Sequence, residues 1–448
     1  MPNSIGRHLE GAMNIAENMA IVECTACRIC GNTELLPVLD LGNQALTGIF
    51  PRPGQVVPTA PLELVRCGPG GCGLLQLRHT SDLTLMYGEH YGYRSSVRPF
   101  MINHLHRKVD VLTGMVDLDR GDLVLDIGSN DSTLLRGYRT AGLTRVGVDP
   151  TGEKWREYYP ADIDLIPDFF TKASYAGQFG TRQAKIVTSI AMFYDLPDPL
   201  GFMSDVHDIL TDDGVWMIEM SYAVPLLETP VYDAICHEHL EYYFLRQIEW
   251  MADRVGLTLA TAEVTDVNGG SLCVTLVKDP AKHKIDTPQI DRIRQYEASL
   301  ALDTDAPYDA FTRRVEQHRV DVRSFLDESK AAGKLTLGYG ASTKGNVILQ
   351  HCGVTAEDLP CIGEVSTEKH GRVTPGTGIP IVSEEDAKAQ RPDQLLVLPW
   401  GFRDGFVERE RDYVAGGGKL VFPLPSVSAI SSQRRKGEDR DVDSGRPS

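Results

Sequence analysis

The chain of 448 residues is long enough for about three domains and an ample core. Its formal net charge of −17 opposes a phosphate backbone and argues against nucleic acid as the main partner. Because the sequence has no run of 18 apolar residues and its start lacks a basic and an apolar segment, we expect a cytoplasmic protein without membrane span or signal peptide.

Closely spaced cysteines follow residues 1–22, which carry little pattern and are expected to form a mobile extension. Five of the nine cysteines fall within the first 72 residues, which in a reducing compartment is typical of a metal site and not of disulfides. Two cysteine knuckles can place four thiolates around one Zn²⁺, a structural site because no position is left for water. We prefer Cys27 with Cys30 and Cys67 with Cys72, since glycine follows Cys30 and Cys72 alike; Cys24 is an alternative for Cys27 or Cys30.

A segment rich in tyrosine and histidine follows at residues 87–96. Tyr91 and Tyr93 could line a cleft, or the segment could be a packed linker with surface polar groups. From Phe100 to Met115 apolar residues recur at helical spacing, which predicts a helix leading into the central domain.

Residues 122–150 predict the first βαβ unit of a nucleoside-binding sheet. Leu123 to Asp126 is typical of a buried parallel strand, Gly128 allows a sharp turn under a ligand, and a helix is expected to begin near Ser132. The next strand ends about 20 residues further on in Asp149, where an acid can hold a ribose diol. The cofactor residues expected from this unit are Asp126, Gly128, Ser129, Asn130, Asp131 and Asp149, with Asn130 or Asp131 as the helix cap.

The kind of nucleoside is inferred from the residues after Gly128. A dinucleotide would need Gly-x-Gly-x-x-Gly so that its pyrophosphate can sit against bare backbone, and residues 129–132 supply no further glycine. An acid and a glycine followed by polar residues suit a ligand with an amino acid and a ribose, which is S-adenosylmethionine. An ordinary strand, turn and helix is the alternative.

Two later strand ends complete the predicted cofactor site. Asp168 could accept a hydrogen bond from the exocyclic amine of a purine while Phe169 or Phe170 stacks on the ring; the two phenylalanines could equally be core. A strand predicted over 184–190 ends where ligands bind in open parallel sheets. At this end Ile190 and Met192 are assigned to the cofactor and Asp195 to catalysis.

The run from Tyr232 to Phe244 is the most reactive-looking in the chain. His237 and His239 flank Glu238, so one imidazole could remove a proton while the acid fixes its tautomer. A zinc-protease motif fails because its second histidine would stand at position 241, which is glutamate. On a helix, side chains two residues apart diverge, so at most one histidine should face a given ligand. A purely structural role for all three is the alternative.

The C-terminal part repeats the arrangement of strand, glycine turn and helix start after a charged helical region at 287–332. Backbone N–H groups at 340–345 can cradle a phosphate, which Lys344 would neutralise, and residues 366–378 form a second basic, glycine-rich loop. This part therefore reads as a small α/β unit for an anion, with a plain structural turn as the alternative. The substrate residues expected here are Ser342, Thr343, Lys344, Lys369, Arg372 and Thr377.

The motifs, in their order and spacing, resemble the S-adenosylmethionine-dependent sugar C-methyltransferases of deoxysugar biosynthesis, over residues 27–425. The resemblance rests on Cys27-Arg-Ile-Cys30-Gly with Cys72-Gly-Leu-Leu-Gln-Leu77, Asp126-Ile-Gly-Ser-Asn-Asp, Tyr232 to His239, Asn268-Gly-Gly-Ser271 and Pro375-Gly-Thr-Gly-Ile-Pro380. It implies an α/β protein with a small four-cysteine zinc-binding N-terminal domain, a central class I (Rossmann-like) methyltransferase domain and a C-terminal α/β Rossmann-like domain. The expected bounds are 1–22 for the extension, 23–95, 96–285 and 286–430 for the three domains, and 431–448 for a disordered tail.

The resemblance also implies roles for single residues. His239 would be the general base, Glu238 would support it, and Tyr91 or Tyr93 would approach the sugar. The C-terminal domain would help to hold a nucleotide-linked 4-keto sugar. Two positions depart from members that methylate C3, which tend to have tyrosine and histidine where this chain has Cys236 and Asp195. The sugar and the methylated carbon, C3 or C5, therefore stay open, and Cys236 and Asn268 join the substrate residues.

We therefore expect an enzyme that removes a proton next to a ketone and transfers a methyl group to the resulting enolate, in deoxysugar or antibiotic biosynthesis. An O- or N-methyltransferase is an alternative that needs no enolate. A NAD-dependent sugar oxidoreductase and a zinc-ribbon nucleic-acid binder are alternatives of other classes. Whether the protein is a monomer or a homodimer is left open by the sequence.

Overall fold

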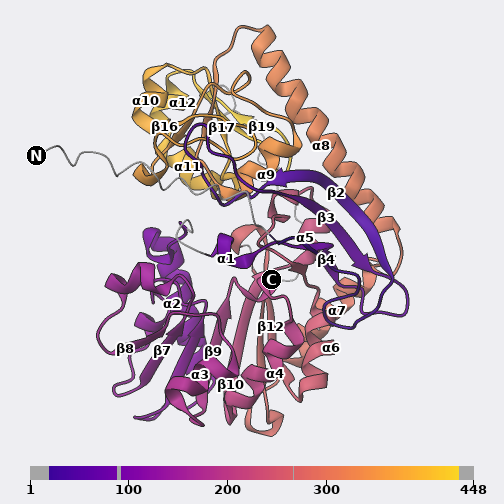
Figure 1. Ribbon diagram of the computed structural model, residues 1–448, viewed down its shortest axis with the longest axis vertical. Helices are drawn as coiled ribbons and strands as arrows, with labels where there is room; N and C mark the ends of the chain where they lie inside the picture. Colours follow the sequence, from indigo (N-terminus) through magenta and orange to yellow (C-terminus); the bar gives the residue numbers. More distant parts are fainter. Residues whose placement is uncertain (1–19, 88–91, 266, 433–448) are drawn as a thin grey trace, which may run out of the picture.

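The computed structural model describes residues 20–87, 92–265 and 267–432. The central sheet forms one lobe and the C-terminal sheet another, while strands β2 (Leu35–Ala45) and β3 (Thr59–Cys67) run along one side of both, next to the long helix α8 (Ala306–Ala331) (Figure 1). Tyr91 and nearly all of the expected extension and tail lie outside the described residues. No helix in the described ranges is long and apolar enough to cross a membrane.

The N-terminal unit is a four-stranded antiparallel sheet with the order β11-β4-β3-β2. Strand β4 (Leu75–Leu77) pairs with β11 (Glu241–Tyr242), which belongs to the chain of the central lobe. A two-stranded ribbon of β1 (Val22–Glu23) and β5 (His79–Thr80) lies beside it, and the short helix α1 (Leu83–Met86) follows. The N-terminal unit is thus joined by main-chain hydrogen bonds to the residues directly after His239.

The central lobe contains a seven-stranded sheet with the order β12-β13-β10-β9-β6-β7-β8. Strands β6 to β10 are parallel, and β13 and β12 are antiparallel. The order reverses at β6, between β7 and β9, which creates a crevice at the carboxyl ends of these strands. The bounds are β6 Leu123–Ile127, β7 Thr144–Val148, β8 Ile163–Ile166, β9 Ala184–Ile190, β10 Leu210–Ser221, β12 Thr258–Thr265 and β13 Ser271–Val277.

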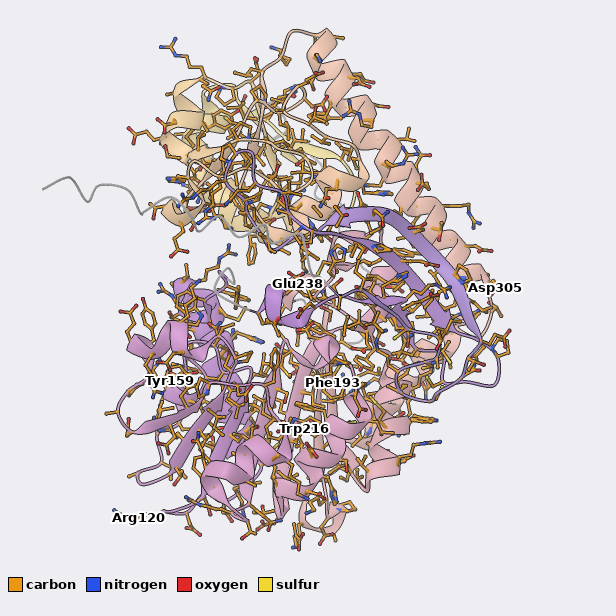
Figure 2. All side chains as sticks on the ribbon, viewed as in Figure 1. Arg120, Tyr159, Phe193, Trp216, Glu238 and Asp305 are labelled. Atoms are coloured by element: carbon orange, nitrogen blue, oxygen red, sulfur yellow. The ribbon has the colours of Figure 1, made fainter. Side chains whose placement is uncertain are left out.

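Helices cover both faces of this sheet, so its central strands are buried on both sides. All five residues of β6, for example, are buried. The largest core side chains include Trp216 and Phe193, whose rings lie 5.9 Å apart at the centre of the lobe (Figure 2). The predicted helix at Phe100 to Met115 is confirmed as α2. The covering helices are α2 Pro99–Thr113, α3 Lys172–Phe179, α4 Pro199–Ile209, α5 Ala223–Glu228, α6 Leu245–Val255 and α7 Thr287–Ser299.

The helix expected to begin near Ser132 does not form, and this prediction was wrong. After β6 the backbone takes positive φ at Gly128 (+79°), Asn130 (+48°) and Ser132 (+62°). Left-handed residues cannot continue into a right-handed helix, so only a single 3-10 turn, Leu135–Gly137, follows. Asn130 and Asp131 therefore cap no α-helix, and their side chains are engaged within the loop region.

The C-terminal lobe is a six-stranded sheet with the order β16-β15-β14-β17-β18-β19, parallel except for β19. This is the predicted second α/β unit, and its strand order also reverses at its first strand, β14. The strands are β14 Thr336–Tyr339, β15 Ile362–Glu364, β16 Ile381–Ser383, β17 Gln394–Val397, β18 Lys419–Phe422 and β19 Ser428–Ile430. The helices are α9 Thr343–His351, α10 Glu384–Ala389, α11 Arg403–Arg409 and α12 Arg411–Ala415.

The segment that carries the His-Glu-His triplet lies where the lobes meet, as the position of Glu238 in Figure 2 shows. Here the indole Nε1 of Trp400, from the C-terminal lobe, donates to Asp233 Oδ2 at 2.7 Å. From the same lobe, Asn346 Nδ2 donates to the carbonyl of Thr47 at 2.7 Å. All three parts of the chain therefore converge on one irregular segment.

Candidate active site

A cavity of about 340 Å³ opens at the carboxyl ends of the central parallel strands, where the switch point predicts a ligand. Its walls come from the linker after the N-terminal unit, from the strand ends, from His239 and from the start of α9. Of the predicted site residues the lining includes Tyr93, Asp126, Gly128, Ser129, Asn130, Asp149, Phe169, Phe170, Ile190, Met192, Asp195, His239 and Lys344.

The glycine loop after β6 is held rigidly against its neighbours. A Cβ on Gly128 would lie 3.0 Å from Met192 Cγ, so the backbone approaches the cavity closely. The amide of Asn130 donates to Asp149 Oδ2 at 2.7 Å, and its side-chain Nδ2 donates to the carbonyl of Tyr93 at 3.0 Å. The loop is thereby tied both to the end of β7 and to the linker that covers it.

Two buried acids face this end of the cavity. Asp126 Oδ1 accepts from Thr188 Oγ1 at 2.6 Å, and burial raises the pKa of Asp126 to about 7. Asp149 Oδ1 accepts from the amide (2.7 Å) and hydroxyl (2.6 Å) of Thr151, and burial raises its pKa as well. Acids beside apolar and aromatic side chains fit the ribose, ammonium and adenine groups of S-adenosylmethionine. Among the described lining residues Lys344 is the one lysine or arginine, so a dinucleotide pyrophosphate would be poorly matched.

Asp131 and Asp168 are not among the described lining residues. Asp131 Oδ1 accepts from the amide and hydroxyl of Thr133, and its Oδ2 accepts from the amide of Ser96 at 3.0 Å. Asp168 is exposed and accepts from the amide of Phe169 at 2.7 Å. The geometry thus assigns Asp131 to loop structure and gives no support to the expected contact of Asp168 with adenine.

Replacement of Asp149 by alanine should weaken binding of S-adenosylhomocysteine about 10- to 100-fold, as removal of a charged hydrogen-bond acceptor does. The carboxylate faces the cavity and also fixes the amide of Asn130. Titration calorimetry measures the affinity, with Asp168→Asn as the matched control. If Asp168→Asn lost as much affinity for S-adenosylhomocysteine, Asp168 would be shown to contribute to the cofactor site.

His239 is oriented for proton transfer. Its Nδ1–H donates to the carbonyl of Ala234 at 2.7 Å, which leaves Nε2 unprotonated and able to accept a proton. The ring of Tyr194 packs against it edge-on, with centroids 4.5 Å apart. Burial lowers the pKa of His239 to about 3, and the charge of Lys344 acts in the same direction. The imidazole is therefore neutral at physiological pH.

The other two members of the triplet are not among the described lining residues. His237 Nε2 donates to the carbonyl of Ala60 at 3.2 Å, and burial lowers its pKa to about 4. Glu238 is buried against the N-terminal unit, where a Cβ on Gly48 would lie 2.5 Å from its Oε1. The expectation that Glu238 fixes the tautomer of the base was wrong, because the segment turns without forming a helix and a backbone carbonyl takes that role.

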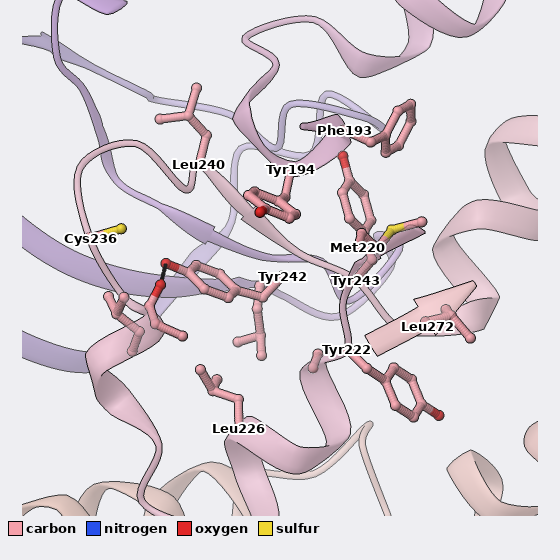
Figure 3. Close-up of a cluster of buried hydrophobic side chains, with 14 of the residues drawn as sticks. Phe193, Tyr194, Met220, Tyr222, Leu226, Cys236, Leu240, Tyr242, Tyr243 and Leu272 are labelled. Atoms are coloured by element: carbon pink, nitrogen blue, oxygen red, sulfur yellow. Dashed lines mark hydrogen bonds between the residues drawn. The ribbon is translucent and has the colours of Figure 1, made fainter. Parts of the chain in front are cut away.

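The surroundings of this segment are packed. Tyr242 donates to the same carbonyl of Ala234 at 3.3 Å, the dashed line in Figure 3. Cys236 is buried on the loop shown there, and burial raises the pKa of its thiol well above the usual range. Cys236 is not among the described lining residues, so its expected contact with the substrate stays a prediction.

Asp195 lines the cavity near His239. Its Oδ2 accepts from the hydroxyl of Tyr87 at 2.6 Å, its buried Oδ1 has no hydrogen-bond partner in the described part of the chain, and burial raises the pKa of its carboxyl strongly. Tyr93 lines the same cavity and is half exposed. Tyr87 and Tyr194 also line the cavity; they stand in segments expected near a ligand, but neither was named as a site residue.

Of the predicted substrate residues in the C-terminal lobe, Lys344 alone lines the described cavity. Lys369 donates to the carbonyl of Ala341 at 2.7 Å, and Arg372 donates to the carbonyl of Phe50 at 2.9 Å. Ser342 caps α9 by accepting from the amide of Gly345, Thr343 is the first residue of that helix, and Thr377 bonds to Thr374. Asn268 lies in the 3-10 turn Val267–Gly269, and its side chain is outside the described part.

Four sulfur atoms of the N-terminal unit form one cluster. The Sγ atoms of Cys27, Cys30, Cys67 and Cys72 all lie within 4.8 Å of one another, and Cys24 is not part of the group. Tetrahedral zinc with Zn–S bonds of about 2.3 Å holds neighbouring sulfurs about 3.8 Å apart. The observed separations of 3.5 Å for Cys27–Cys72 and for Cys30–Cys67 fit this ion. The predicted ligand set is therefore brought together.

The cysteine cluster is coupled to the His239 segment. Arg28, between two of the cysteines, forms an ion pair with Glu241 at 3.5 Å, and both side chains are fully buried. The amide of Leu77 donates to the carbonyl of Leu240 at 2.8 Å, and Gln247 Nε2 donates to the carbonyl of Cys72 at 2.8 Å. The zinc-binding unit therefore fixes the strand that begins two residues after His239.

Comparisons with known proteins follow the same division of the chain. Residues 27–87 match the family profile of a putative zinc binding domain, 98–262 a methyltransferase domain, and 266–425 a C-methyltransferase C-terminal domain. The C-methyltransferase NovU of Streptomyces niveus is 31% identical over 414 residues, which cover 91% of this chain and 97% of NovU.

Solved structures match a smaller part. The glycopeptide N-methyltransferase MtfA, complexed with S-adenosyl-L-methionine, is 13% identical with a TM-score of 0.30, over 39% of this chain and 93% of that one. The YcgJ protein of Bacillus subtilis is 12% identical with a TM-score of 0.32, over 40% of this chain and 98% of that one.

Proposed function

The chain belongs to the C-methyltransferase family, and we propose that it methylates a carbon next to the ketone of a nucleotide-linked 4-keto deoxysugar. It is an S-adenosylmethionine-dependent methyltransferase with a zinc-binding N-terminal domain. The domain bounds 23–95, 96–285 and 286–430, the sugar and the reaction mechanism are part of the proposal.

One observation carries the proposal: His239 presents an unprotonated Nε2 to the same cavity that the glycine loop lines. Carbon acids next to ketones are far too weak to ionise unaided at neutral pH, so transfer to carbon needs a positioned base. Transfer to a hydroxyl or amine removes no C–H proton and passes through no enolate.

Different residues of the cavity bind the cofactor and remove the proton. Asp149, Phe169 and Phe170 hold the adenosyl end, where bound S-adenosylmethionine supplies an electrophilic methyl group. His239 takes the proton at Nε2, and the carbonyl of Ala234 stabilises the imidazolium through Nδ1–H. The methyl transfer itself needs the methyl donor and the acceptor carbon to be aligned and water to be excluded, and it requires no metal.

The test is hydrogen exchange without methyl transfer. The enzyme is mixed with S-adenosylhomocysteine and dTDP- or UDP-linked 4-keto-6-deoxyhexoses in D₂O, and NMR follows deuterium at C3 and C5. Exchange at one of these carbons, followed by methylation there when S-adenosylmethionine is supplied, is the expected result. Methylation of an oxygen or nitrogen without exchange would establish the rival methyltransferase. Tight binding of NAD in calorimetry, with none of S-adenosylhomocysteine, would establish an oxidoreductase.

The pH dependence should carry the signature of a buried base. A histidine in water has a pKa of about 6.5, whereas burial lowers that of His239 to about 3, so it stays neutral as pH falls from about 8 to about 5. Because kcat/KM reports groups of the free enzyme, His239 should add no acid limb near pH 6.5. Any decline there should follow the binding of S-adenosylhomocysteine, since burial raises the pKa of Asp126 in the same cavity to about 7. A decline through about pH 6.5 that S-adenosylhomocysteine binding does not share would show that the imidazole is protonated there.

A further inference from the structure

Lys344 reaches the cavity from the C-terminal lobe and is held there by a rigid turn. Strand β14 is followed by Gly340, whose φ is +82° and where a Cβ would lie 2.6 Å from Pro399 Cδ. Ser342 caps α9 through the amide of Gly345, and a Cβ at Gly345 would lie 2.8 Å from Leu398 Cβ. The start of α9 therefore has little freedom, and its second residue, Lys344, lines the cavity.

Helix α9, which carries Lys344, packs against the turn Tyr232–Ala234, and the carbonyl of Ala234 holds His239, so the two side chains line the cavity from neighbouring elements. The positive charge of Lys344 lowers the pKa of His239 and acts in the same direction on Asp233. Across the described ranges it takes part in no hydrogen bond and no ion pair within 4.0 Å. The nearby Asp233 carboxylate is engaged by Trp400 at 2.7 Å. The donors of Lys344 are thus available to a ligand beside the imidazole.

Resting on the function proposed above, we infer that Lys344 is a catalytic residue that binds the ketone oxygen of the substrate and stabilises the enolate. The α-carbon and the ketone oxygen are separated by two bonds, so a base and a cation serving them must converge at one end of the cavity. His239 and Lys344 do so from different lobes. A cation placed where negative charge develops supplies electrostatic stabilisation without later reorganisation.

Protons and electrons balance in both steps of the reaction. Nε2 of His239 takes the proton, the C–H electron pair becomes the carbon–carbon double bond, and the carbonyl π pair moves to oxygen beside Lys344. In the transfer, the double-bond pair forms the new bond to the methyl carbon and the oxygen returns to a ketone. The sulfur of the cofactor keeps the electron pair of the broken C–S bond. The imidazolium of His239 then releases its proton to solvent.

The arrangement also resolves a conflict in the free enzyme. Lys344 lowers the basicity of His239, which by itself would oppose proton removal. Once the oxygen becomes negative, its charge offsets that of Lys344, and the imidazolium forms next to a neutralised pair. The basicity of His239 is therefore lowest in the empty site and rises as the enolate forms.

The test compares Lys344→Met with Lys344→Arg and the control Lys334→Met, which removes an exposed charge of the same lobe outside the cavity. The probes are S-adenosylhomocysteine, dTDP, UDP and the keto sugar that wild type exchanges. We expect Lys344→Met to lower the exchange rate at saturating sugar about 10²- to 10³-fold. Binding of S-adenosylhomocysteine and of the nucleoside diphosphates should change less than about twofold, and Lys344→Arg should restore part of the rate.

Other outcomes overturn the assignment. Weaker binding of dTDP or UDP with an unchanged saturated exchange rate would make Lys344 a phosphate anchor. Weaker binding of S-adenosylhomocysteine with that rate unchanged would pair Lys344 with the cofactor carboxylate. Because S-adenosylhomocysteine binding also reports folding, loss of exchange together with loss of that binding would equally overturn the catalytic role. No exchange by wild type with any sugar would contradict the proposed function itself, and this inference would fall with it.

Discussion

Replacement of His239 by alanine should lower the exchange of the substrate α-hydrogen about 10²- to 10⁴-fold, the range that a positioned general base supplies. The side chain is the one imidazole among the described lining residues, and its Nδ1–H bond to Ala234 leaves Nε2 for the substrate. Methyl transfer should fall by a similar factor, because the enolate precedes it. Exchange is followed by NMR in D₂O with S-adenosylhomocysteine bound.

His237→Ala is the matched control for this prediction. His237 stands two residues away, is deeply buried, and faces the carbonyl of Ala60 on β3. Its loss should leave the exchange rate within a few-fold of wild type. A rate that survives in His239→Ala would remove the imidazole from the base role. Equal losses in both variants would point to disorder of the whole segment.

Loss of one zinc ligand should abolish activity without abolishing cofactor binding. In Cys30→Ser the tetrahedral set of sulfurs is broken, and elemental analysis should find far less than the expected one zinc per chain. Structural zinc contributes about 10–16 kcal/mol to folding of isolated zinc fingers. We expect a fall in melting temperature on the order of 10 °C, less than full unfolding, because the central sheet keeps its own core.

The effect on catalysis follows from the contacts between the zinc-binding unit and the central lobe. Without the metal, the Arg28–Glu241 pair and the β4–β11 pairing lose their support, and His239 loses its fixed position. S-adenosylhomocysteine should still bind, since the residues proposed to hold it, such as Gly128 and Asp149, follow β6 and β7 in the central lobe. Cys24→Ser is the matched control, because Cys24 lies outside the cluster and should keep the zinc. If Cys24→Ser lost its zinc and Cys30→Ser kept it, Cys24 would be the zinc ligand in place of Cys30.

Local patterns were enough to predict much of the fold. Buried strands such as Leu123–Ile127 and Ala184–Ile190 show as short segments rich in apolar residues, because a sheet covered on both faces favours apolar side chains. The cysteine knuckles showed as spacing, because thiolates close in sequence are close in space. The prediction of a helix after Gly128 was wrong because the conformation there depends on contacts with distant parts of the chain. Asn130 and Ser132 adopt positive φ through bonds to other segments, which no local propensity records.

The amino-acid pattern alone predicted one zinc-binding unit and two α/β units, the glycine loop with its two acids, a cysteine cluster for one metal, and a base at His237 or His239. The resemblance to a family then singled out His239. Packing in three dimensions was needed to show that the carbonyl of Ala234, and not Glu238, bonds to Nδ1 of His239, and that Lys344 enters the cavity from another lobe. Strand burial and cysteine spacing are properties of neighbouring residues. The direction of a side chain in an irregular segment depends on contacts between parts of the chain more than 100 residues apart, as the bond from Trp400 to Asp233 illustrates.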